Sequence, residues 1–85
     1  MAEEEIGAVV KFFSKPSVAA VEITNGSIKV GDTLHFKGHT TDFNDVIESM
    51  EIDNNSVSEA NSGDMIGIKV KERVREKDTV YKVSD

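Results

Sequence analysis

Apolar and polar residues alternate along most of this chain, and this period of two limits the fold more than any other feature. Successive side chains of a strand point to opposite faces, so such alternation is typical of strands with one buried face. Turn-forming residues interrupt it about every 8–12 positions, and no stretch keeps the 3.6-residue period of a helix. The pattern predicts an all-β fold of six or seven short strands. Because closure removes the exposed edges of so small a sheet, we expect a small closed barrel.

The predicted strands are separated by short polar or glycine-containing turns. Pro16 ends the first strand because its nitrogen carries no hydrogen for a strand ladder. Glu48 interrupts the apolar parity of the strand around it and indicates a bulge or a twist there. Residues 57–60 fit either a helical turn or an extended bend. The expected strands span about residues 6–13, 18–24, 33–38, 44–52, 65–71 and 79–83.

The dipeptide Asn25-Gly26 gives the strongest local prediction. Both residues tolerate a positive φ, which a two-residue type I′ hairpin requires at its central positions. Such a hairpin would pair Ile23 with Ile28 and would place an acidic residue opposite a basic one, both of which favour this register. Further structural turns are predicted at Gly31-Asp32, Gly63-Asp64 and Asp78.

Length and composition set the broad class of the protein. At 85 residues the chain can form one domain, over residues 1–85, and is too short for two independent cores. It contains no cysteine, which excludes a disulfide framework and a thiolate ligand. Its apolar runs fall far short of the ~20 residues that span a bilayer. Residues 1–5 are acidic where a signal peptide is basic, and we expect them to be disordered. These features predict a cytoplasmic protein without a membrane segment.

No arrangement of residues in the sequence indicates catalysis or cofactor binding. A phosphate-binding P-loop ends in Gly-Lys-Ser/Thr and leads into a helix, whereas Gly31 is followed by Asp32 and a predicted strand. His35 and His39 would lie roughly 13 Å apart along one strand face, too far to share a metal ion. The Gly-x-Ser-x-Gly motif of serine hydrolases does not occur. We therefore expect a protein that is not an enzyme, with no cofactor and no metal.

Residues 69–77 form a basic segment in an acidic chain. The chain has 10 basic and 16 acidic residues and a net charge of −6, whereas this segment carries +3 and the rest carries −9. The basic residues stand at every second position and would share one face of an extended chain. The favoured interpretation is a solvated strand edge that discourages aggregation. The alternative is a stripe that binds phosphate or carboxylate, with RNA as a candidate ligand and these five residues as candidate polyanion-binding residues. These residues are Lys69, Lys71, Arg73, Arg75 and Lys77.

Two glycine-containing motifs resemble a known module. They read G-x-I-K-x-G-D over residues 26–32 and V-x-x-A-x-x-G-D-x-I-G-I over residues 57–68. In this order and separation they resemble the second domain of translational GTPases such as elongation factor Tu. The segments at 38–43 and 72–83 resemble small stand-alone elongation-factor-like proteins and the C-terminal barrel of collagenase-like peptidases. Related sequences usually carry glycine where Lys77 stands, so either Lys77 adopts a strained φ or the turn differs.

The resemblance implies a six-stranded Greek-key barrel of the elongation-factor second-domain type, which carries out no chemistry itself. In the GTPases this domain packs on the GTP-binding domain and contacts tRNA or ribosomal RNA. The GTP-binding domain is missing from this chain, so we expect no GTP binding by the chain alone. The leading hypothesis is a non-catalytic, elongation-factor-like binding module in translation or RNA handling, or an accessory subunit. The alternative is a protein–protein interaction subunit, unrelated to RNA, that docks on a peptidase-like or other larger partner.

Overall fold

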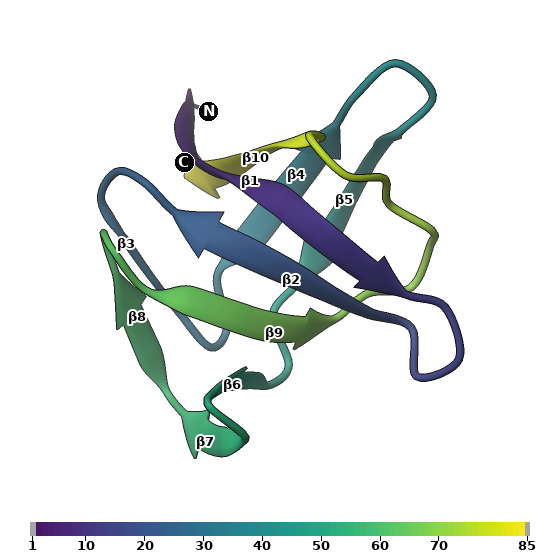
Figure 1. Ribbon diagram of the computed structural model, residues 1–85. Coiled ribbons are helices and arrows are strands. Elements are labelled where there is room, and N and C mark those ends of the chain that lie inside the picture. The colour runs from purple at the N-terminus through teal and green to yellow at the C-terminus, as the bar shows by residue number, and fades with distance from the viewer. Residues whose placement is uncertain (1, 85) are drawn as a thin grey trace.

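The computed structural model describes residues 2–84, which form ten strands and no helix (Figure 1). The all-β prediction is confirmed. Within the described range, no helix is long and apolar enough to cross a membrane. The strands are β1 (Ala2–Phe13), β2 (Val18–Ile23), β3 (Ser27–Lys29), β4 (Thr33–Lys37), β5 (Asp42–Val46), β6 (Met50–Ile52), β7 (Asn55–Val57), β8 (Glu59–Asn61), β9 (Met65–Lys69) and β10 (Thr79–Ser84).

Eight of the strands form one antiparallel sheet in the order β5-β4-β10-β1-β2-β9-β6-β7, and β3 pairs with β8 in a small second sheet. Figure 1 shows the large sheet curling over, so that β4 and β5 lie behind β1 and β2. The last strand, β10, pairs with β1 on one side and β4 on the other. Among residues 2–84, β5 and β7 each pair on one side only. The strand ladders by themselves therefore do not confirm the closed six-stranded barrel that was expected.

The alternation of the sequence becomes one buried face on the strands. Along β2, for example, Ala19, Val21 and Ile23 are fully buried and the residues between them are more exposed. Phe36 of β4 stacks on Phe43 of β5 with ring centroids 5.1 Å apart. Burying one large apolar side chain stabilises a fold by roughly 1.5–3 kcal/mol, so this core is the main support of the structure. Its buried members are Ile6, Val9, Ala19, Val21, Ile23, Ile28, Leu34, Phe36, Ile47, Met50, Ala60, Ile66, Ile68, Val70, Val74 and Val80.

The predicted hairpin at Asn25-Gly26 is wrong. Gly26 has a φ of 72°, but Asn25 does not have the positive φ that a type I′ turn also requires there. The carbonyl of Ile6 accepts hydrogen bonds from the N–H groups of Thr24 (2.8 Å) and Asn25 (3.2 Å), which directs the chain away from β2. Strand β2 pairs with β1 and β9, and β3 pairs with β8. Long-range pairing has therefore overridden the local turn preference.

Two consecutive positive φ values occur instead at Asp53 (52°) and Asn54 (66°). These residues join β6 to β7, with Ile52 paired to Asn55. This is the two-residue connection and the sign of φ that a type I′ hairpin requires. Asp and Asn tolerate the left-handed region better than other residues with side chains, which explains the turn without a glycine.

The turns at Gly31-Asp32 and Gly63-Asp64 share one geometry. Each glycine has a positive φ, 100° and 97°, which a residue with a side chain adopts only under strain. Each aspartate donates its N–H to the carbonyl three residues earlier, at 3.0 Å for Asp32 and 2.9 Å for Asp64. Its carboxylate in turn accepts the N–H of that earlier residue, at 2.9 Å and 2.8 Å. The Gly-Asp pair thus closes the turn from both directions.

The same turn is built a third time at residues 75–78, without a glycine. The N–H of Asp78 donates to the carbonyl of Arg75 at 3.1 Å, and the Asp78 carboxylate accepts the N–H of Arg75 at 2.8 Å. Lys77 occupies the glycine position with a φ of 75°. Of the two expectations for Lys77, the strained φ is therefore the one observed.

Three expected boundaries are corrected by long-range pairing. Strand β1 begins at Ala2, so residues 2–5 are not a disordered tail but pair with β10; Met1 lies outside the described residues. The expected strand at 44–52 is divided into β5 and β6 because Ile47 is buried and donates its N–H to the carbonyl of Asp32 at 2.9 Å. The strand expected over 65–71 ends at Lys69. Residues 57–60 adopt the extended alternative, from the end of β7 through a bend at Ser58 into β8.

Candidate binding surfaces

The basic segment 69–77 begins at the end of β9 and continues as a loop to β10 (Figure 1). The segment is not a strand beyond Lys69, but two of its residues are buried. Val70 and Val74 are 3% and 1% exposed, and the basic residues around them are exposed. The two valines therefore anchor the loop to the core and direct the charged side chains outward.

Hydrogen bonds to neighbouring elements hold the first half of this loop. Ser17, in the turn between β1 and β2, accepts the N–H of Val70 at its carbonyl (2.9 Å) and donates its hydroxyl to the Val70 carbonyl (2.7 Å). The Asp45 carboxylate of β5 accepts the N–H of Lys71 at 2.9 Å. The loop is thus fixed across the space between β9 and β5.

The second half of the loop is held against β1. Lys77 donates its N–H to the Val9 carbonyl and Val9 donates its N–H to the Asp78 carbonyl, both at 2.8 Å. The guanidinium Nε of Arg75 donates to the Thr40 hydroxyl at 2.9 Å. Asp78 itself is only 5% exposed. These hydrogen bonds therefore fix the backbone of this half of the loop against β1.

The five candidate polyanion-binding residues do not form one continuous row. Lys69 and Lys71 line a pocket of about 320 Å³ together with the acidic side chains of Asp45 and Glu48. The two arginines line a different pocket, of about 380 Å³, which we call the arginine pocket; it is lined by Phe12, Arg73, Val74, Arg75 and Glu76. Lys77 lies in the strained turn and lines neither pocket. The two lysines of the basic segment therefore lie beside acidic residues, whereas the two arginines line a separate pocket.

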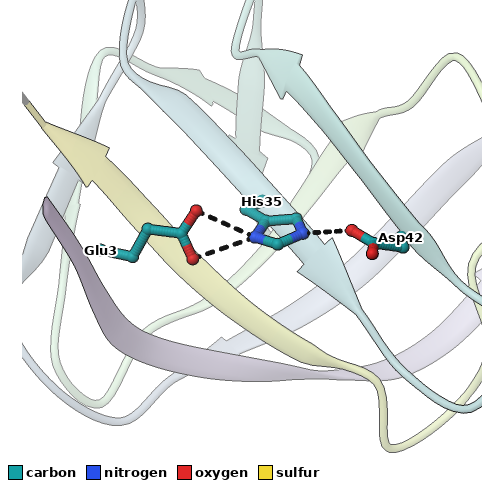
Figure 2. Close-up of polar contacts among 3 residues, drawn as sticks. All are labelled: Glu3, His35 and Asp42. Carbon is teal, nitrogen blue, oxygen red and sulfur yellow. Dashed lines mark hydrogen bonds and ion pairs between the residues drawn. The ribbon is translucent and has the colours of Figure 1, made fainter. Parts of the chain in front are cut away.

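A cluster that the sequence did not predict joins three strands at His35 (Figure 2). His35 Nδ1 lies 3.0 Å from both carboxylate oxygens of Glu3 on β1, and His35 Nε2 lies 2.5 Å from Oδ1 of Asp42 on β5. The imidazole also lies 5.9 Å from the ring of Tyr81 on β10. Only 14% of the His35 side chain is exposed. Because Glu3 precedes His35 by 32 positions, no local spacing indicated the contact.

The contacts of His35 favour its charged form. A neutral imidazole has one N–H, whereas here both ring nitrogens face carboxylates that can only accept. The hydrogen bond to Glu3, and then that to Asp42, raises the pKa of His35 above its ordinary value. The hydrogen bond from His35 lowers the pKa of Asp42. The two nitrogens contact carboxylates on opposite sides of the ring (Figure 2), so the arrangement is a clamp between strands and not a chelate for one metal ion.

The outer side of β1, β2 and β9 carries exposed apolar residues among charged ones, with Lys11 paired to Ala20 and Glu51 of β6 paired to Gly67. Phe13 and Met65 are 44% and 46% exposed. Between them lie small residues, with Ala20 paired directly to Gly67, and Phe13 is paired to Val18. A shallow pocket of about 280 Å³ lies over this region, and polar residues also line it, namely Glu51, Asp53 and Asn54. We call this surface the apolar face; it consists of Phe13, Val18, Ala20, Met65 and Gly67.

Comparison with known proteins agrees with both resemblances that the sequence suggested. The family model described as Elongation factor Tu domain 4 matches residues 3–81. An uncharacterized protease of Methanocaldococcus jannaschii is 42% identical over 78 residues, which are 91% of this chain and 19% of that protein. A collagenase of Porphyromonas gingivalis is 35% identical over 78 residues, which are 91% of this chain and 22% of that protein. The chain thus spans about a fifth of the length of the curated relatives it matches.

Solved structures share the fold. The C-terminal domain of a Geobacillus thermoleovorans protein classed as a U32 peptidase superposes with a TM-score of 0.88 and 24% identity, over 95% of this chain and 93% of that one. GDP-bound aIF5B from Aeropyrum pernix superposes with a TM-score of 0.64 and 20% identity, over 94% of this chain and 14% of that one. At these identities the likeness shows the fold alone.

Proposed function

Because the chain belongs to the Elongation factor Tu domain 4 family, we propose that it is a non-catalytic binding domain, and that it docks on a larger, peptidase-like protein through the apolar face. The observation that carries this proposal is the exposure of Phe13 and Met65 on either side of the small residues Ala20 and Gly67. Exposed apolar surface of this kind is typical of protein–protein contact sites. Small residues on a sheet face also allow the backbone of a partner to approach closely.

The nature of the relatives supports a peptidase-like partner over other proteins. The curated relatives named as a protease and as collagenases contain the matching region as about a fifth of a longer chain. A domain of this kind therefore occurs next to a much larger polypeptide in those proteins. We propose that the equivalent larger body is what covers the apolar face here.

The role in translation or RNA handling expected from the sequence remains the rival proposal. It draws support from the family and from Arg73 and Arg75. Lys69 and Lys71 support RNA binding less, because acidic side chains lie in the same pocket as these two lysines. A chain with a net charge of −6 also repels a polyanion outside the basic segment.

Affinity capture from lysate of the source organism separates the two proposals, with and without nuclease and with mass-spectrometric identification of what is retained. We expect a U32-type peptidase to be retained after nuclease treatment. The variant Met65→Glu places a charge on the apolar face and should abolish retention, whereas Val30→Glu, at an exposed apolar residue outside that face, should not. Retention of ribosomal components alone, lost on nuclease treatment, would contradict docking on a peptidase, as would equal retention by Met65→Glu.

A further inference from the structure

We infer that the arginine pocket receives an acidic side chain of the protein partner, with an apolar neighbour of that side chain placed against Phe12. This inference rests on the proposed function, since it assigns the chemistry that the docked partner carries. The pocket has a volume of about 380 Å³ and is formed where the loop between β9 and β10 passes β1. It is large enough for one or two side chains and too small for a folded element.

The charges lining the pocket select an anion. Two guanidinium groups, those of Arg73 and Arg75, face one carboxylate, that of Glu76, so the lining has a net positive charge. Of the other carboxylates of the loop, that of Asp78 accepts the N–H of Arg75, and Glu72 does not line the pocket. Planar guanidinium groups bind carboxylates with two parallel hydrogen bonds, which makes the pair strong and specific in direction.

The pocket is also organised before any ligand arrives. Val74 is buried between the two arginines and fixes the backbone, and the Thr40 hydroxyl holds Nε of Arg75. The turn at Asp78 closes the loop behind them. Because the frame does not have to become ordered on binding, little conformational entropy is lost when a ligand enters.

The surroundings favour one carboxylate over a chain of phosphates. An RNA backbone needs a row of cations at regular spacing, but Lys69 and Lys71 share their pocket with Asp45 and Glu48. Phe12 and Val74 add an apolar wall beside the two arginines. This combination fits an acidic residue next to an aliphatic one in a polypeptide.

The position of the pocket connects it to the apolar face. Phe12 lines the pocket, and the next residue, Phe13, belongs to the apolar face. Successive residues of a strand point to opposite sides, so the end of β1 separates the two surfaces. A partner that covers the apolar face and extends past the end of β1 reaches the arginine pocket.

The experiment uses a small probe pair and the intact chain. The C-terminal amides acetyl-leucyl-glutamate amide, with one carboxylate, and acetyl-leucyl-glutamine amide, which is neutral, are titrated into labelled protein, and the Nε–Hε signals of the arginines are followed by NMR. We expect saturable shifts at Arg73 and Arg75 with the glutamate probe only. Arg73→Gln should weaken binding roughly tenfold or more, as expected for the loss of a hydrogen bond to a charged group. Glu76→Gln should strengthen it, and Lys69→Gln, a control outside the pocket, should leave it unchanged.

Equal binding of the neutral probe, or no saturable shift at either arginine, would overturn the inference. So would binding of oligouridylate that Lys69→Gln and Arg73→Gln weaken equally, because it would indicate a continuous polyanion track. Thermal unfolding of each variant checks that the fold is retained. The outcome is independent of the capture experiment: loss of probe binding with retained docking refutes only the pocket assignment, and retained docking by Met65→Glu refutes only the docking face.

Discussion

At the scale of single residues, the same turn geometry occurs three times in the molecule. A residue with positive φ followed by an aspartate closes the turns at Asp32, Asp64 and Asp78, with the same pair of hydrogen bonds in each. Glycine occupies the positive-φ position in two of them and Lys77 in the third. Lys77 therefore stores strain beside the arginine pocket, in the loop that we propose binds the partner.

Replacing Lys77 by glycine should stabilise the protein. A residue with a side chain in the left-handed region costs on the order of 1–2 kcal/mol, and the greater flexibility of glycine in the unfolded chain offsets part of the gain. We expect a net increase of about 0.5–1 kcal/mol in the free energy of unfolding, measured by urea denaturation. Lys77→Ala removes the same charge but keeps the Cβ, so it is the control and should show no such gain. A Lys77→Gly variant no more stable than Lys77→Ala would mean that the turn carries no strain.

At the scale of elements, the His35 clamp, formed by Glu3, His35 and Asp42, links parts of β1 and β5 to β4. Each of these parts has a strand partner on one side only. Residues 2–5 of β1 pair with β10 but lie beyond the part of β1 that pairs with β2. Glu3 in this segment and Asp42 at the start of β5 are both bound to His35 of β4. The charged groups facing the imidazole are thus two carboxylates, with Lys37 also acting on Asp42. The clamp fastens the beginning of β1 and the sheet edge at β5 to the centre of the sheet.

The clamp makes stability depend on pH in a defined window. Because the folded pKa of His35 is raised, its contribution is fully present below its ordinary pKa of about 6.5 and is lost as pH rises through the folded value. Because the pKa of Asp42 is lowered, its contribution is present above its ordinary pKa of about 4 and is lost as pH falls through the folded value. The stabilisation from the clamp should therefore be greatest between about pH 4 and 6.5.

Urea denaturation of wild type and His35→Gln across pH 5 to 9 measures this contribution. Glutamine keeps a polar side chain of similar length but cannot become charged. The stability difference between the two proteins should be largest near pH 5.5 and should shrink toward pH 9. A difference that is the same at both pH values would show that the charge on His35 plays no part.

At the scale of the whole molecule, the first and last strands lie side by side at the centre of the sheet. β10 is inserted between β1 and β4, and β2 joins β1 to β9. This strand order brings segments that are distant in the sequence to common surfaces. The apolar face combines β1, β2 and β9, and the arginine pocket combines β1 with the loop before β10. The motif at 26–32 leads into the strand β4 and not into a helix.

Millimolar GTP should leave the thermal unfolding midpoint of this chain unchanged. A ligand raises the midpoint only when it binds the folded state, and phosphate cradles are usually formed by the amides at a helix N-terminus. Residues 2–84 contain no helix, and the chain carries a net charge of −6. Differential scanning fluorimetry with GTP, and with ATP as a control for nonspecific effects, measures this. A saturable rise of several degrees with GTP would contradict the prediction.

The sequence by itself determined which strand residues face the core and where the two Gly-Asp turns lie, because both are local properties. A period of two places alternate side chains on opposite faces whatever the partner strand is, so Val21, Ile23, Leu34 and Phe36 could be assigned to a core. A Gly-Asp pair closes its own turn within four residues, so Gly31-Asp32 and Gly63-Asp64 were also predictable. The motifs built from these residues were sufficient to indicate the family.

Only the tertiary structure decided which strands pair and which side chains meet. The local preference of Asn25-Gly26 for a hairpin lost to the pairing of β2 with β1 and β9, because those two ladders satisfy more backbone groups and bury more apolar surface than a two-strand hairpin. Glu3 and His35 are 32 positions apart, and their contact depends on β10 lying between β1 and β4. The same holds for Phe12 and Arg73, which the closing of the loop over β1 brings to one pocket. Strand order is a property of the whole chain, and no pattern within a short segment of the sequence encodes it.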